Sequence, residues 1–67
     1  MHILVFPMSD GTWCVKEEKT SKVYFGNTEE VVFKEFREAN PRETVVTIER
    51  TTEEVVLRGV IEEIIAS

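Results

Sequence analysis

The residues that could supply a nucleophile and a base are few, and they lie near the N-terminus. The chain has one histidine, His2, and one cysteine, Cys14, with Ser9 between them. A nucleophile needs a base within hydrogen-bond reach, an orienting third group and a site for the oxyanion. Lys16 stands two residues beyond Cys14, where its charge would favour the thiolate. Because the rest of a catalytic set is missing, we expect no catalytic residue and no enzyme activity.

Ligands for a metal or a phosphate cofactor are missing as well. A structural metal site needs several Cys or His side chains, and one of each is not enough. Phosphate-binding loops contain clustered glycines, whereas Gly11, Gly26 and Gly59 each stand alone in this chain. We therefore expect no metal and no cofactor.

Pairs of adjacent glutamates are the main charged motif. Adjacent helical residues point about 100° apart, so such a pair does not converge as an acid–base couple would. Acids in the first turn of a helix are favoured by the helix dipole, but acids in a last turn are not. An alternative is an acidic surface that mimics a phosphate backbone and binds a basic protein. The candidate residues of this acidic face are Glu29, Glu30, Glu53, Glu54, Glu62 and Glu63.

Four of these glutamates belong to a heptapeptide that occurs twice. Residues 28–34, TEEVVFK, return as residues 52–58, TEEVVLR, with five identical positions. In each copy a threonine and two glutamates precede an apolar run, which is typical of a helix N-terminus. Each copy also follows a strand-like run. The sequence therefore predicts two strand–helix units that follow an N-terminal hairpin.

The flanking patterns predict an α+β fold with the element order β-β-β-α-β-α. We expect an antiparallel N-terminal hairpin or meander sheet with two helices on one face. The Asp10-Gly11 pair is typical of a tight hairpin turn. We expect one small domain over residues 1–67, with the hairpin or meander at 2–25 and the strand–helix units at 22–40 and 43–66.

The helix boundaries follow from capping patterns. Asn27 with Glu30, and Thr51 with Glu54, have the spacing of capping boxes. The second helix has a competing interpretation as a strand, because most of its apolar residues are β-branched and Gly59 interrupts it. Helical periodicity favours a helix, whereas composition also allows a strand over part of 52–66. The order of the strands in the sheet stays open at this stage.

The second predicted helix carries a wide apolar arc. At about 100° per residue, its apolar positions cover roughly half of the circumference. A helix of this composition is marginal unless it is docked on something. The candidate residues for binding a partner through this apolar helix are Val60, Ile61, Ile64 and Ile65.

The hairpin carries a weaker candidate surface. Strand alternation places Lys16 and Tyr24 together, with Lys22 nearby, opposite a face that holds Trp13 and Phe25. A basic face with an aromatic residue is typical of proteins that read single-stranded nucleic acid. The net charge of −5 argues against nucleic acid as a partner, because an acidic chain repels nucleic acid and anionic membranes.

The short apolar N-terminal run and the single cysteine indicate the cellular compartment of the protein. The apolar run 3–6 is too short for a signal peptide or a membrane span, and no basic residue precedes it. One cysteine cannot form an internal disulfide, which fits a reducing compartment. We expect a cytoplasmic protein with no membrane partner.

Two segments resemble HicB-type antitoxins, which are small, catalytically inactive relatives of RNase H-like folds. They are Trp13-Cys14-Val15 after the Asp-Gly turn, and Gly26-Asn27-Thr28-Glu29-Glu30 before the first helix. The chain departs from that family in lacking a Leu-Pro-Gly-type segment before the helix and an alanine-rich helix face. An RNase H-like nuclease needs a metal-binding Asp in its first strand, and residues 2–6 contain none. The resemblance therefore implies a regulator that neutralises a basic protein, without nuclease activity.

The leading functional hypothesis is a small, acidic, non-enzymatic protein-interaction module. It would either self-associate as a homo-oligomer or bind a protein partner through the apolar helix. The alternative is a regulator or inhibitor of nucleic-acid machinery, acting as an acidic mimic or as an antitoxin-type neutraliser. Salt separates the two, because binding through carboxylates weakens as ionic strength rises.

Overall fold

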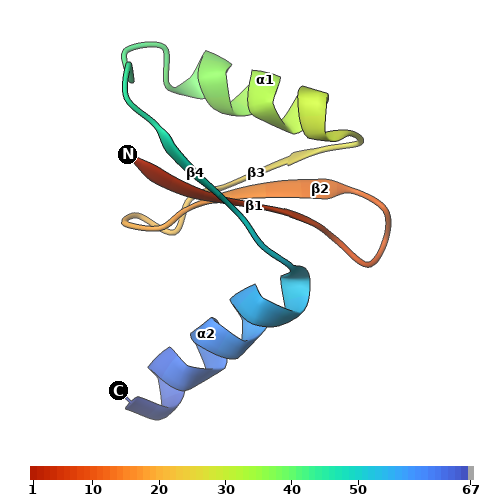
Figure 1. Ribbon diagram of the computed structural model, residues 1–67, viewed down its shortest axis with the longest axis vertical. Helices are drawn as coiled ribbons and strands as arrows, with labels where there is room; N and C mark the ends of the chain where they lie inside the picture. The colour runs from red at the N-terminus through yellow and green to blue at the C-terminus, as the bar shows by residue number, and fades with distance from the viewer. Residues whose placement is uncertain (67) are drawn as a thin grey trace.

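The computed structural model describes residues 1–66, so that Ser67, the last residue of the predicted domain, lies outside the described residues. The element order is β-β-β-α-β-α, which confirms the predicted α+β fold. The second repeat forms a helix and no strand. The elements are β1 (His2–Pro7), β2 (Trp13–Glu17), β3 (Val23–Gly26), α1 (Glu29–Ala39), β4 (Thr47–Arg50) and α2 (Glu53–Ala66) (Figure 1).

The strands form one mixed sheet in the order β3-β2-β1-β4. β1, β2 and β3 form the predicted antiparallel meander, with Val5 opposite Val15 and Val15 opposite Tyr24. β4 adds to the free edge of β1 in parallel, with Ile3 beside Ile48. This answers the question that the sequence left open, because the last strand pairs with the first.

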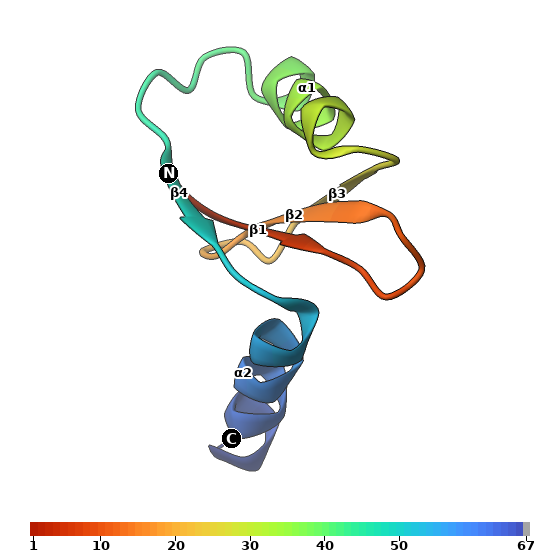
Figure 2. The same cartoon turned by 45° about the vertical axis from the view of Figure 1, so that its right-hand side comes forward.

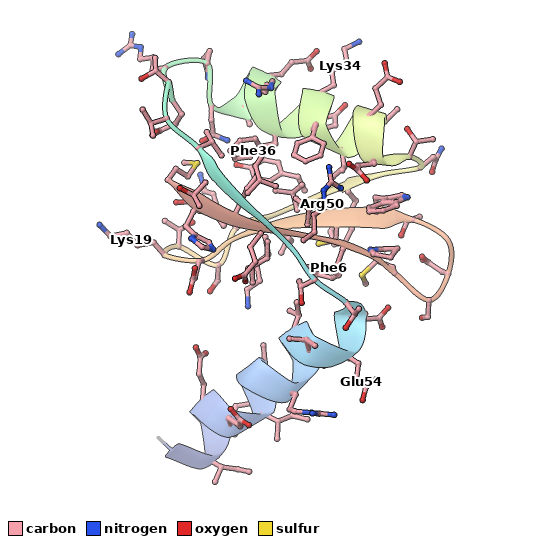
Figure 3. The ribbon with its side chains drawn as sticks, viewed as in Figure 1. Phe6, Lys19, Lys34, Phe36, Arg50 and Glu54 are labelled. Atoms are coloured by element: carbon pink, nitrogen blue, oxygen red, sulfur yellow. The ribbon has the colours of Figure 1, made fainter. Side chains whose placement is uncertain are left out.

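α1 covers one face of this sheet and closes the core. Ile3, Val5 and Val15 point to this face, and Val32 and Phe36 of α1 pack on them. Phe36 also meets the ring of Tyr24 edge-on, with ring centroids 5.6 Å apart. Figure 3 shows Phe36 pointing from α1 toward the sheet. We call this side of the sheet the core face.

Both helices begin at the same place in the repeated heptapeptide. Thr28 caps α1, since its hydroxyl accepts a hydrogen bond from the backbone N–H of Val31 at 3.1 Å. Thr52 does the same for α2, accepting from Val55 at 3.3 Å. The predicted caps, Asn27 and Thr51, were therefore one residue too early in both copies. The threonine that opens each repeat is the cap itself.

α2 does not share the core face with α1. It descends on the opposite side of the sheet, and the turned view shows its axis running away from the strands (Figure 1, Figure 2). The prediction of two helices on one face was wrong in this respect. The physical reason lies in β4, which ends at the edge beside β1 and leads the chain past the sheet to the uncovered side.

The molecule is extended because α2 stands off the sheet. Its radius of gyration is 12.2 Å, whereas a compact domain of this length has about 11 Å. Its principal extents are 35 × 26 × 15 Å. The fold therefore consists of a packed β-β-β-α-β body and a helix that projects from it.

Candidate functional site

The nucleophile and base candidates are held apart. His2 opens β1, whereas Cys14 pairs with Phe6 near the other end of that strand. His2 and Phe6, the partner of Cys14, are four positions apart in β1, which corresponds to about 13 Å along the strand. His2 instead lies beside Glu18, with 3.3 Å between Nε2 and a carboxylate oxygen. The His–Cys dyad that the sequence made conceivable is therefore not assembled.

Cys14 is buried as an ordinary apolar side chain. Its exposed fraction is 2%. Burial raises the pKa of the Cys14 thiol, and the positive charge of Lys16 offsets this only in part. The lysine effect foreseen from the sequence exists but loses to desolvation, so the thiol stays protonated near neutral pH.

Within residues 1–66, no group of three or more His, Cys, Asp or Glu side chains is placed to hold a metal ion. Over the same range, no helix has the length and hydropathy needed to cross a membrane.

The glutamates of the predicted acidic face lie in separate environments. Glu29 pairs with Arg50 of β4 at 2.5 Å, and Glu54 pairs with Arg58 one turn along α2. Glu53 accepts the backbone N–H of Ser9. Because α1 and α2 lie on opposite sides of the sheet, the two first-turn pairs do not join into one surface. Of the six predicted residues, the exposed ones are Glu30, Glu54, Glu62 and Glu63.

The hairpin surface with a basic face and an aromatic residue does not form. Tyr24 pairs with Val15 on the core face, where its hydroxyl accepts a hydrogen bond from Asn40 at 3.1 Å. Lys16 lies on the opposite face, beside Val23. The assignment of Tyr24 to the face of Lys16 was wrong. Val23, Tyr24 and Phe25 are all apolar or aromatic, so alternation alone could not choose which of them points to the core.

The face opposite α1, which we call the outer face, holds the most distinctive surface of the molecule. Strand alternation places Leu4, Phe6, Cys14, Val23 and Phe25 on it. Phe6 and Cys14 are buried, whereas Val23 and Phe25 at the β3 edge are about half exposed. Figure 3 shows Phe6 on the side of the sheet toward α2. A sheet face this apolar is ordinarily covered.

A cleft of about 190 Å³ separates the outer face from α2. Leu4, Lys16 and Glu49 line it from the sheet, and the helix contributes one side of its surface. Leu4 and Glu49 were not predicted to be part of a site, and Lys16 was assigned only to the hairpin surface, because the cleft depends on where α2 lies. The helix residues that line the cleft are Thr51, Val55, Val56, Gly59, Val60 and Glu63.

The predicted apolar arc of α2 is divided between the cleft and solvent. Val60, one of the four candidates, is partly buried against the cleft. The other three, Ile61, Ile64 and Ile65, are 56%, 69% and 80% exposed. Leu57, which the sequence reading left out of the candidate set, is 53% exposed and lines a shallow groove with Pro7, Met8 and Ser9.

The comparisons with known proteins identify no relative. No family model, no curated protein and no solved structure matches the chain.

Proposed function

We propose that this chain is a non-enzymatic protein-interaction module that binds a protein through α2. The observation that carries the proposal is the row of large aliphatic side chains that α2 exposes, namely Leu57, Ile61, Ile64 and Ile65. Contiguous apolar surface of this kind on a small protein is typical of an interaction site.

The energetics of α2 support this proposal. A helix of 14 residues is marginal in water, and β-branched residues with an internal glycine weaken it further. In α1 the residues of the first repeat are stabilised by packing, since Val32 is fully buried. Val56, at the same place in the second repeat, is only partly buried. A partner that covers α2 would supply the burial that its own sheet does not.

The non-enzymatic part of the proposal rests on the candidate nucleophile. Cys14 is buried, its pKa is raised by burial, and the only histidine lies at the far end of β1. These side chains act as core and surface residues.

The second candidate, a regulator that binds a basic protein of the nucleic-acid machinery, would use exposed acids. Glu62 and Glu63 favour it, because both lie in the last turns of α2, where the helix dipole disfavours acids. Stability of the isolated helix does not explain their presence. A basic partner would.

The test is affinity capture on the immobilised protein from an extract of cells that produce it, with Ile61→Glu as the disrupting variant. Val45→Glu is the matched control, because Val45 is 74% exposed and lies in the loop before β4. We expect a protein that is retained by the wild type and by Val45→Glu, is lost with Ile61→Glu, and stays bound at about 1 M salt. Elution by salt with no effect of Ile61→Glu would favour the acidic alternative. Equal capture by all variants at all salt concentrations would reject both.

A further inference from the structure

The exposed apolar residues of α2 have the spacing of a helix-pairing stripe. Leu57, Ile61 and Ile64 are separated by four and then three residues, and Ile65 adjoins them. At 100° per residue all four fall within about 100° of the helix circumference. We call these four residues the outer stripe. Large aliphatic residues that are alternately four and three positions apart form a seam along which a second helix can pack.

The outer stripe points away from the cleft side of the helix. Val55, Gly59 and Glu63 line the cleft, and the outer stripe is centred roughly opposite them. The sheet of the same chain therefore cannot cover the stripe without a rotation of α2. Such a rotation would expose Val56 and Val60, which are now partly buried against the cleft.

The surface area of the molecule indicates how large the missing contact is. The chain exposes 5030 Å², whereas a compact monomer of 7.7 kDa exposes about 4,300 Å². The excess of about 700 Å² is close to the ~800 Å² that each partner buries in a typical specific interface. One chain of similar size would therefore be sufficient to cover it.

The charges beside the stripe are complementary in one orientation. Arg58 and Glu62 lie along the same flank of the outer stripe, one turn apart. If a second α2 packs antiparallel about a twofold axis at the level of Val60, Arg58 of each copy comes to the level of Glu62 of the other. In the parallel orientation this flank of each copy would lie on opposite sides of the interface, so that Arg58 and Glu62 would not meet, and the helix dipoles would be aligned unfavourably.

We infer that the protein forms a twofold homodimer in which the outer stripes of two α2 helices pack antiparallel. The inference rests on the proposed function and names its partner as a second copy of the chain. A twofold axis makes the interface isologous, so that one stripe serves both sides. Glu62 then has a structural role.

The test begins with light scattering over a wide range of protein concentration at low and high salt. We expect a mass twice the 7.7 kDa of one chain, persisting at high salt because the contact is mainly apolar. Ile61→Glu should give a monomer, and Val45→Glu should remain a dimer. A single-chain mass at every concentration, or a dimer unaffected by Ile61→Glu, would overturn the inference.

Charge reversal tests the orientation with variants that leave the apolar residues in place. Arg58→Glu and Glu62→Arg should each weaken dimerisation about 5- to 30-fold, because each creates two like-charge contacts. The double variant, or a mixture of the two single variants, should restore the wild-type affinity. Failure of restoration would overturn the antiparallel arrangement. If the wild type is a monomer but Ile61→Glu still abolishes capture of another protein, the proposed function holds and only the self-association fails.

Discussion

The backbone N–H of Ser9 donates a hydrogen bond of 2.6 Å to Oε2 of Glu53. This contact ties the β1–β2 turn to the first turn of α2 and directs the helix off the sheet. Glu29 holds the same place in the first repeat, and it pairs with Arg50 at the end of β4. The first glutamate of each repeat therefore fixes the start of its helix to a different part of the sheet.

Replacing Glu53 by alanine should loosen the start of α2. A charge-assisted hydrogen bond and a favourable helix-dipole contact are both lost, which we expect to cost about 1–2 kcal/mol of local stability. Amide hydrogen exchange should accelerate at Ser9 and through the first turn of α2, while β1 and β2 stay protected. Glu54→Ala is the control, since its exposed pair with Arg58 is worth about 0.3–0.5 kcal/mol. Equal acceleration in both variants would mean that the contact with Ser9 does not hold the helix.

The position of the helix caps can be tested at the first repeat. Thr28→Ala removes the hydroxyl that accepts from Val31, and should lower the free energy of unfolding by about 1 kcal/mol. Asn27→Ala should change it by less than about 0.5 kcal/mol, because Asn27 is exposed and lies outside the cap. Urea unfolding measures both. A larger effect at Asn27 would restore the cap that the sequence pattern first suggested.

The corresponding change in the second repeat should behave differently. Thr52→Ala removes an equivalent cap, but α2 contributes little to the core. We expect a weaker helical signal in circular dichroism with almost no shift of the main urea transition. A shift as large as that of Thr28→Ala would indicate that α2 unfolds together with the sheet.

Local sequence patterns were sufficient to predict the elements but not how they pack. The repeated heptapeptide correctly predicted two helices, and the first of them buries Val32 and Phe36 against the sheet. In the second copy of the heptapeptide, Val56 takes the place of Val32 but is only partly buried. The burial of a helix residue depends on what lies opposite the helix. That depends in turn on the pairing of β4 with β1, a contact between residues more than forty positions apart. Tyr24 shows the same limit within one strand, since its face is set by its pairing with Val15.

Two glycines should respond in opposite directions to alanine. A Cβ at Gly26 would lie 2.6 Å from the backbone nitrogen of Val32 and 2.9 Å from its Cα, where α1 begins against β3. Because backbone atoms cannot move aside cheaply, we expect Gly26→Ala to destabilise the protein by about 1–3 kcal/mol.

Gly59 is the counterpart in α2, where an added Cβ meets nothing within 4 Å. Alanine there should strengthen the helix by about 0.5–1 kcal/mol, because glycine is the weaker helix former. Circular dichroism should show a gain in helicity, and thermal unfolding should separate the two variants by sign. Loss of stability in Gly59→Ala would mean that this position is closely packed against a partner.

Cys14 links the stability of the fold to pH. Burial raises the pKa of its thiol above the ordinary value of 9.0, so the folded chain keeps the proton that the unfolded chain releases. The contribution of the neutral thiol to stability is therefore complete below pH 9 and decreases as pH rises through and above that value. Urea unfolding between pH 7 and pH 10 should show a steeper loss of stability for the wild type than for Cys14→Ala, which lacks the titrating group.

The burial of Cys14 should also make its thiol react with a disulfide reagent far more slowly in buffer than in denaturing urea. Equal reaction rates in the two solvents would show that the outer face opens readily around Cys14.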